Sequence, residues 1–152
     1  FLQEIFRNLT ADDIDVSTFV LDHICYRVET WDRYLLLKTQ LLKIGTLLTE
    51  SDIGGRPIAS FKFFEPLEFK DRSIGVIELP APKTGSFYAE GYEHAEFVIE
   101  ESFETFIKNH PHVKFDERAL NKTINPEIIL KYGELSVKFH HHTLEYVIKF
   151  LD

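Results

Sequence analysis

The sequence predicts an α+β fold of two βαβββ modules, with helices on the outer face of a mixed sheet. Residues 22–28 (DHICYRV) and 93–99 (EHAEFVI) alternate polar and apolar side chains, as expected of strands with one covered face. Each is followed by a helical pattern and then by strand candidates. We predict a single domain over 1–152, with module one at about 22–80, module two at about 93–141, and terminal helices at both ends.

In module one, Thr30 can cap a helix that ends at Gly45, because a threonine hydroxyl accepts from the first-turn N–H groups. A turn at 52–55 (DIGG) separates the first two of the strands that follow. Proline at 80 and 82 ends the last of them. The expected strands are 46–50, 57–64 and 73–79.

In module two, a helix over 102–109 stops before Pro111. Three strands are expected after it, near 119–124, 127–132 and 135–141, the last two joined by a two-residue turn at Gly133 and Glu134. The first segment of the chain, 2–9, has the stripe of a short amphipathic helix. The tail TLEYVIKFLD suits a helix or a strand, and we favour a helix.

Composition narrows the classes of function. Hydrophobic residues make up 44% of the 152 residues, enough for a folded core. The net charge of -8 would be repelled by phosphate backbones and anionic lipids, so neither nucleic acid nor a membrane is an expected partner. We find no apolar run near the roughly 18 residues that cross a bilayer, and no signal-peptide pattern at the start, so we expect a cytoplasmic protein.

Three residues suggest a polar pocket. His23 and His94 occupy the same position in the first strand of each module, on the polar face. Glu78 stands among apolar neighbours, where an unpaired charge is expensive. Imidazole nitrogens and a carboxylate oxygen suit a divalent Zn, Ni, Fe or Mn ion. The alternative is that both histidines are ordinary hydrogen-bonded residues and that Glu78 pairs with Arg27.

Other charged groups are expected around this pocket and could hold a carboxylate or phosphate. The ligand would then be a small anionic molecule, although the same charges could instead form a buried ion network. Cys25 shares the face of His23 and is interpreted as a small buried residue rather than a nucleophile. The predicted ligand-binding residues are Arg27, Arg56, Lys62 and Lys138, with Glu96 nearby.

The arrangement resembles the vicinal-oxygen-chelate superfamily of glyoxalases, fosfomycin-resistance proteins and extradiol dioxygenases, in which two βαβββ modules form a cupped sheet around a metal. A closer resemblance rests on five strings of the sequence: DHICYRV, GGRPIASFK, SIGVIELPAP, GYEHAEFVI and NPEIILKYGELSVKFH. Together these strings resemble the bacterial YecM family.

The resemblance implies that His23, Glu78 and His94 fill three of four metal-ligand positions. At the fourth ligand position, this sequence has Lys138 where the superfamily usually has Glu. His140 lies two residues further along the same strand face and could replace the missing ligand. If the tail were a strand, Glu145 would fill the position instead. We favour His140.

Two functions follow from this resemblance. One is a metal-dependent isomerase, lyase or oxidoreductase acting on a small anionic, oxygen-rich substrate, with Glu78 or Glu96 as base. The other is a non-catalytic small-molecule or metal-binding protein of the same fold. Lys138 in a ligand position would favour the form of this alternative that binds no metal.

Overall fold

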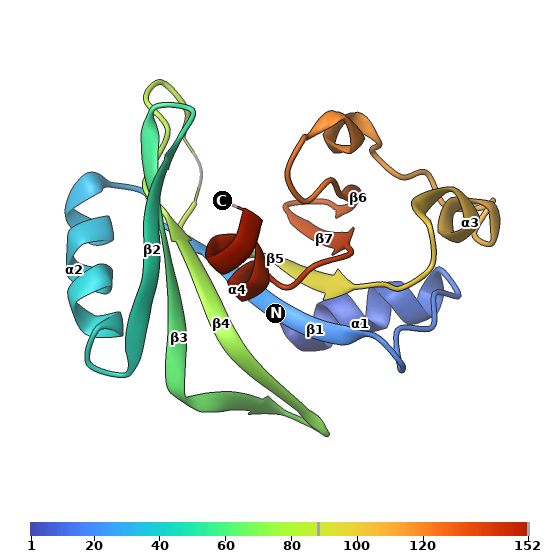
Figure 1. Cartoon of the computed structure of the whole chain (residues 1–152), viewed down its shortest axis with the longest axis horizontal. Helices are drawn as coiled ribbons and strands as arrows, with labels where there is room; N and C mark the ends of the chain where they lie inside the picture. Colours follow the sequence, from blue (N-terminus) through green and yellow to red (C-terminus); the bar gives the residue numbers. More distant parts are fainter. Residues whose placement is uncertain (88, 152) are drawn as a thin grey trace. The chain divides into compact units, whose positions relative to one another are not determined.

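A computed structural model of the chain describes residues 1–87 and 89–151 and confirms the α+β class (Figure 1). The chain divides into two compact units, which we call the central unit (His23–Glu93) and the terminal unit (Phe1–Asp22 with His94–Asp152). In the described ranges we find no helix with the length and apolarity that a membrane crossing requires.

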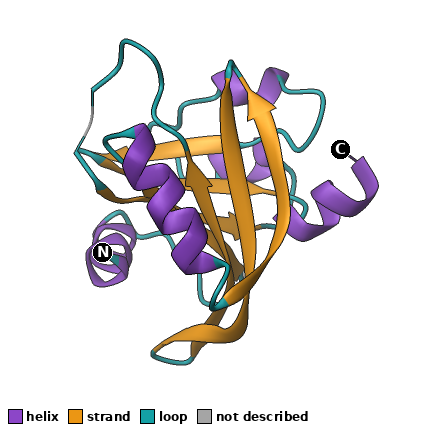
Figure 2. Ribbon diagram, turned by 90° about the vertical axis from the view of Figure 1, so that its left-hand side faces the viewer, coloured by secondary structure: helices purple, strands orange, loops and turns teal. Residues whose placement is uncertain are grey.

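The central unit follows the predicted βαβββ order. Its elements are β1 (Val20–Arg27, whose first three residues belong to the terminal unit), α2 (Trp31–Leu41), β2 (Gly45–Ile53), β3 (Arg56–Phe69) and β4 (Arg72–Pro80). The strands lie in the order β2-β3-β4-β1, with β1 parallel to β4 and the other neighbours antiparallel. Figure 2 shows α2 lying across the strands of this unit. The predicted strands are therefore present and longer than expected.

Local sequence signals explain the ends of these elements. Thr30 caps α2 by accepting from the Arg33 backbone N–H at 3.1 Å, as predicted. Gly54 and Gly55 form the two-residue turn between β2 and β3, and both have positive φ, which glycine adopts without steric cost.

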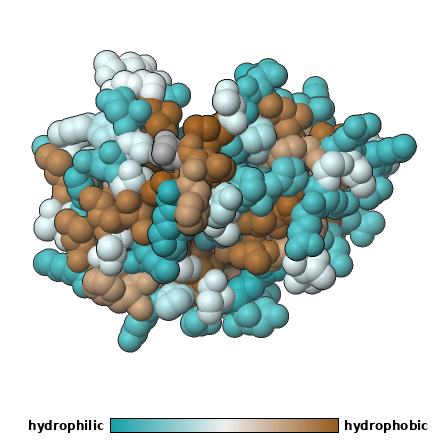
Figure 3. Space-filling view, in the orientation of Figure 1, coloured by the Kyte–Doolittle hydropathy of each residue, from teal (hydrophilic) through white to brown (hydrophobic). Residues whose placement is uncertain are grey.

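The helix α2 buries less apolar surface than its sequence suggests. Tyr34 is the buried residue of this helix, and its hydroxyl donates to Glu50. Hydrophobic residues gather at the surface over α2, at the left of Figure 3. The exposed large apolar side chains of α2 are Trp31, Leu35 and Leu36.

Glu90, in the loop after β4, forms hydrogen bonds with side chains of β1 and α2. Arg33 binds both carboxylate oxygens of Glu90, at 3.0 and 2.6 Å, and the Tyr26 hydroxyl donates to the same group at 3.0 Å. The hydrogen bonds from Arg33 lower the pKa of Glu90 below its ordinary value.

The terminal unit contains a strand fewer than predicted. Its elements are α1 (Leu2–Ala11), β5 (Gly91–Val98, which begins in the central unit), α3 (Phe103–Lys108), the 3-10 turn η1 (Arg118–Asn121), β6 (Ile128–Tyr132), β7 (Leu135–His140), α4 (Leu144–Tyr146) and the π-helical turn η2 (Val147–Leu151). The strand order is β5-β7-β6, with β5 parallel to β7 and β6 antiparallel to it. The helical tail is as predicted.

The strand expected near 119–124 is wrong, because η1 occupies the first three residues of that segment and the other three form no strand. Asn125 has a φ of 49°, which no strand residue adopts, and the following Pro126 has no N–H to donate to a ladder. Pairing at this edge is reduced to a single bridge between Asp116 and Ile129, with N–H···O distances of 2.7 and 3.0 Å.

The predicted covered face of the first strands is confirmed. Tyr26 is half-buried. The other members of this face are buried: Ile24, Val28, Ala95, Phe97 and Ile99. In the terminal unit an aromatic group surrounds Phe97, which meets Phe6 of α1 edge-on at 6.0 Å and stacks with Phe139 of β7 at 5.9 Å.

Replacing Gly45 with Ala should destabilise the central unit by about 1–3 kcal/mol, because overpacking against rigid backbone forces it to shift. A Cβ at Gly45 would lie 2.6 Å from the Lys62 carbonyl oxygen. The matched control is Gly75→Ala, since a Cβ there meets nothing within 4 Å. Urea unfolding should give a lower midpoint for Gly45→Ala alone, and equal midpoints would refute the close approach of β2 and β3.

Candidate metal and ion centre

Two of the predicted ligands meet in the central unit. β1 and β4 are parallel neighbours whose register pairs His23 with Val76 and Cys25 with Glu78. His23 is buried, and Glu78 is half-buried. Each offers a donor atom within 4.8 Å of the other. An imidazole nitrogen and a carboxylate oxygen at this separation could bind one divalent ion.

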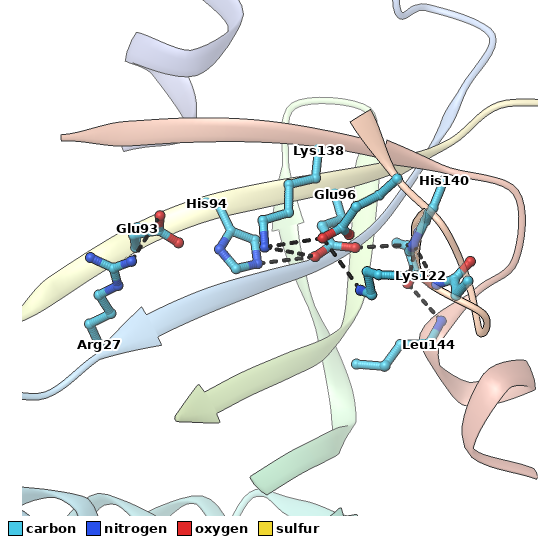
Figure 4. Close-up of polar contacts among 11 residues, drawn as sticks. Arg27, Glu93, His94, Glu96, Lys122, Lys138, His140 and Leu144 are labelled. Carbon is cyan, nitrogen blue, oxygen red and sulfur yellow. Dashed lines mark hydrogen bonds and ion pairs between the residues drawn. The ribbon is translucent and has the colours of Figure 1, made fainter. Parts of the chain in front are cut away.

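Cys25 is also buried on β1, as expected of a small apolar residue. Three of the residues predicted to bind an anionic ligand lie in this unit, and each has a different environment. Arg27 forms an ion pair with Glu93 at 3.3 Å, drawn in Figure 4. Arg56 donates to the Ala81 carbonyl oxygen at 3.0 Å, which ties β3 to the segment after β4. Lys62 is exposed on β3.

The other predicted residues lie in the terminal unit, on β5 and β7. The parallel register of these strands pairs Glu96 with Lys138, His94 with Ser136 and Val98 with His140. His94, Glu96 and His140 are buried, and the Lys138 side chain is 21% exposed. Figure 4 shows their side chains directed toward one another from the two strands.

The Glu96 carboxylate connects the two histidines. Its Oε1 lies 3.1 Å from His94 Nε2, and its Oε2 lies 3.0 Å from His140 Nδ1 (Figure 4). The Lys138 ammonium is 3.9 Å from the same Oε1. The sequence pattern placed these groups on one face, and the strand register determines which of them touch.

Three further residues of this cluster were not predicted. Glu127, just before β6, lies 3.6 Å from Lys138 and 3.5 Å from Lys122. Asn125 contacts His140 Nδ1 at 2.9 Å through its side-chain amide. The third is Asp22, which precedes His23 in β1; a period of two places it on the opposite face from His23, so the pattern gives no sign that it joins this cluster.

Asp22 connects the cluster to the helical tail. Its Oδ2 is 3.6 Å from His140 Nε2 and accepts the Leu144 backbone N–H at 2.9 Å. Glu145 is on α4 and pairs with Lys149 of η2 at 3.4 Å, as expected for a helical tail.

The cluster also contains a possible metal-ligand group. Glu96, Glu127 and His140 are buried, and each offers a donor atom within 4.8 Å of the others. These donors could hold a cation. Two lysine ammonium groups already lie near Glu127, however, so the charge of its carboxylate is compensated within the protein.

The chain is an α+β protein with buried and half-buried donor groups that could hold a metal ion. The sequence profile of the YecM protein family matches residues 1–150, and the chain belongs to this family. Protein YecM of Escherichia coli (strain K12) is 27% identical over 165 residues, which cover 97% of this chain and 85% of that protein. An uncharacterized protein of Haemophilus influenzae (strain Rd) is 33% identical over 101 residues, or 64% of this chain and 50% of that protein.

Solved structures share the fold. Protein EC4020, from structural genomics, has a TM-score of 0.83 and 24% identity, covering 100% of this chain and 87% of that one. A structure described as a putative dioxygenase from Bacillus subtilis has a TM-score of 0.53 and 11% identity, covering 82% of this chain and 41% of that one.

Proposed function

We propose that this protein is a divalent-metal-dependent enzyme of the vicinal-oxygen-chelate superfamily, acting on a small, anionic, oxygen-rich substrate. The observation that carries the proposal is the pair formed by His23 and Glu78, predicted from sequence as ligands and found with donor atoms within 4.8 Å. The reaction would be of the isomerase, lyase or oxidoreductase type.

A site formed by an imidazole nitrogen and a carboxylate oxygen would favour zinc or a transition metal. Neutral imidazole suits Zn, Ni and Fe, whereas carboxylate oxygen also suits Mn. His23 and Glu78 would hold the ion, which would supply Lewis acidity toward the oxygens of a substrate. The protein would contribute ligands from rigid strands, which hold them more accurately than a loop does.

Metal uptake tests the proposal. The untagged protein is stripped with chelator, and binding of Zn²⁺, Ni²⁺, Fe²⁺ and Mn²⁺ is measured by calorimetry and elemental analysis. We expect one ion per chain and a loss of affinity of about 100-fold or more for His23→Ala and for Glu78→Ala, since even outer-shell changes cost about 10- to 100-fold.

The matched control is His142→Ala, because this histidine is exposed and stacks on Tyr146 at 5.0 Å. Circular dichroism establishes that each variant is folded. Unchanged affinity in both ligand variants would reject this pair as the metal site.

A second function, a non-catalytic binding protein of the same fold, is favoured by one specific observation. Lys138 lies 3.9 Å from Glu96 and 3.6 Å from Glu127, so that its ammonium provides a cation beside two buried carboxylates. If the parent protein takes up none of the four ions, this second function replaces the first.

A further inference from the structure

The helix α2 has apolar side chains on two sides, one of which packs within its own unit. Tyr34 is buried, and Leu37 and Leu41 are half-buried, at the spacing of three and four residues that marks one face of a helix. On the other side, Leu35 is 47% exposed and Leu36 is 46% exposed. Helices that are apolar all round are normally buried, so the exposed side of α2 is suited to a contact with another surface.

This exposed side forms an extended apolar surface. Trp31, Leu35 and Leu42 are four and seven residues apart, so they lie along one line of the helix. Ile44 follows the helix, and its carbonyl oxygen accepts the Phe64 backbone N–H at 2.9 Å, which extends the surface onto β3. Each of these side chains is about half exposed or more (Figure 3). The surface, called the α2 stripe below, consists of Trp31, Leu35, Leu36, Leu42, Ile44 and Phe64.

The charged groups beside the α2 stripe have opposite signs at its two ends. Asp32 is exposed in the first turn of α2, and Lys43 is exposed just after the C-cap. They are eleven residues apart, or about three helical turns, so they lie on the same side of the helix. Lys38 pairs with Glu50 at 2.7 Å, so its charge is compensated within the unit. An antiparallel copy of this helix would place an opposite charge at each end.

We propose that the α2 stripe binds a second copy of this chain, with the two α2 helices packed antiparallel about a two-fold axis. Asp32 of each copy then faces Lys43 of the other, and the leucines of both copies meet between these ion pairs. A membrane surface fits this side of α2 less well. A helix that lies on a membrane has a polar flank rich in Lys and Arg, and the net charge of this chain is -8.

Sedimentation equilibrium of the full chain measures the dissociation constant of the dimer. We expect Leu35→Glu to weaken dimerisation about 30-fold or more, because it places an unpaired charge near the centre of the contact. The matched control is Ile53→Glu, since Ile53 is 57% exposed at the end of β2 and lies outside the α2 stripe. This control should dimerise like the parent.

Charge reversal tests the antiparallel arrangement. Asp32→Lys and Lys43→Asp each place like charges together at both ends of the contact, so each should weaken dimerisation about 10-fold. An equimolar mixture of the two variants should associate about as strongly as the parent, because every Lys then faces an Asp of the other chain. The double variant should also recover the parent's affinity.

A parent that stays monomeric up to about 1 mM would overturn the proposal. A dimer that is equally strong in the parent and in folded Leu35→Glu would do the same, and circular dichroism establishes that the variant is folded. If Leu35→Glu does not fold, the charge-reversal mixture decides, since failure to restore association would reject the antiparallel contact. Binding of the parent to anionic lipid vesicles, lost in Leu35→Glu, would assign the stripe to a membrane instead.

Discussion

Replacing Phe97 with Ala should lower the free energy of unfolding by about 3–5 kcal/mol, the range for removing a large aromatic side chain from a core. Phe97 is 0% exposed on β5 and contacts Phe6 of α1 and Phe139 of β7. Phe139 continues this packing to Phe106 of α3, with ring centroids 4.8 Å apart. The substitution would leave a cavity, because the close-packed strands and neighbouring aromatic rings cannot move far enough to fill it.

Urea unfolding followed by circular dichroism measures this loss. Phe87→Ala is the control, because the Phe87 side chain is 86% exposed and its removal should change stability by no more than about 0.5 kcal/mol. Equal unfolding midpoints for the Phe97 variant and the parent would show that the apolar face of β5 has been assigned wrongly.

Replacing His140 with Ala should lower the free energy of unfolding by about 1–3 kcal/mol, because removing one partner of a buried polar contact leaves the other group unsatisfied. The ring nitrogens of His140 lie 3.0 Å from Glu96 and 3.6 Å from Asp22, and the residue is completely buried. His140→Asn should recover part of the loss, since its side-chain amide can both donate and accept hydrogen bonds in place of the ring nitrogens.

Glu145→Ala is the informative comparison with His140→Ala, because Glu145 and His140 are both candidates for the fourth ligand position. The Glu145 side chain is 20% exposed and pairs with Lys149 one helical turn away, a contact of about 0.3–0.5 kcal/mol. We therefore expect little change in stability or in metal affinity for Glu145→Ala. A loss of affinity confined to that variant would restore the usual ligand set of the superfamily.

The sequence alone determined the faces of the strands and the order of most elements. Alternation with a period of two assigned Ile24 and Phe97 to the covered face and His23 and His94 to the polar face, because successive strand residues point to opposite sides. The turn at Gly133 fixed the hairpin of β6 and β7, and the tail was correctly predicted as helical. These features are local, so a short window of sequence contains the information.

The tertiary structure decided which polar groups touch. Strand alternation could not show that Glu96 lies between His94 and His140, because the parallel register of β5 and β7 depends on packing between segments about forty residues apart. Nor could it show that Asp22 lies near His140 at the end of β7 and accepts the Leu144 backbone N–H at the start of the helical tail. Periodicity assigns a side chain to a face, whereas its partners depend on how distant strands and loops pair, and only the folded chain fixes that pairing.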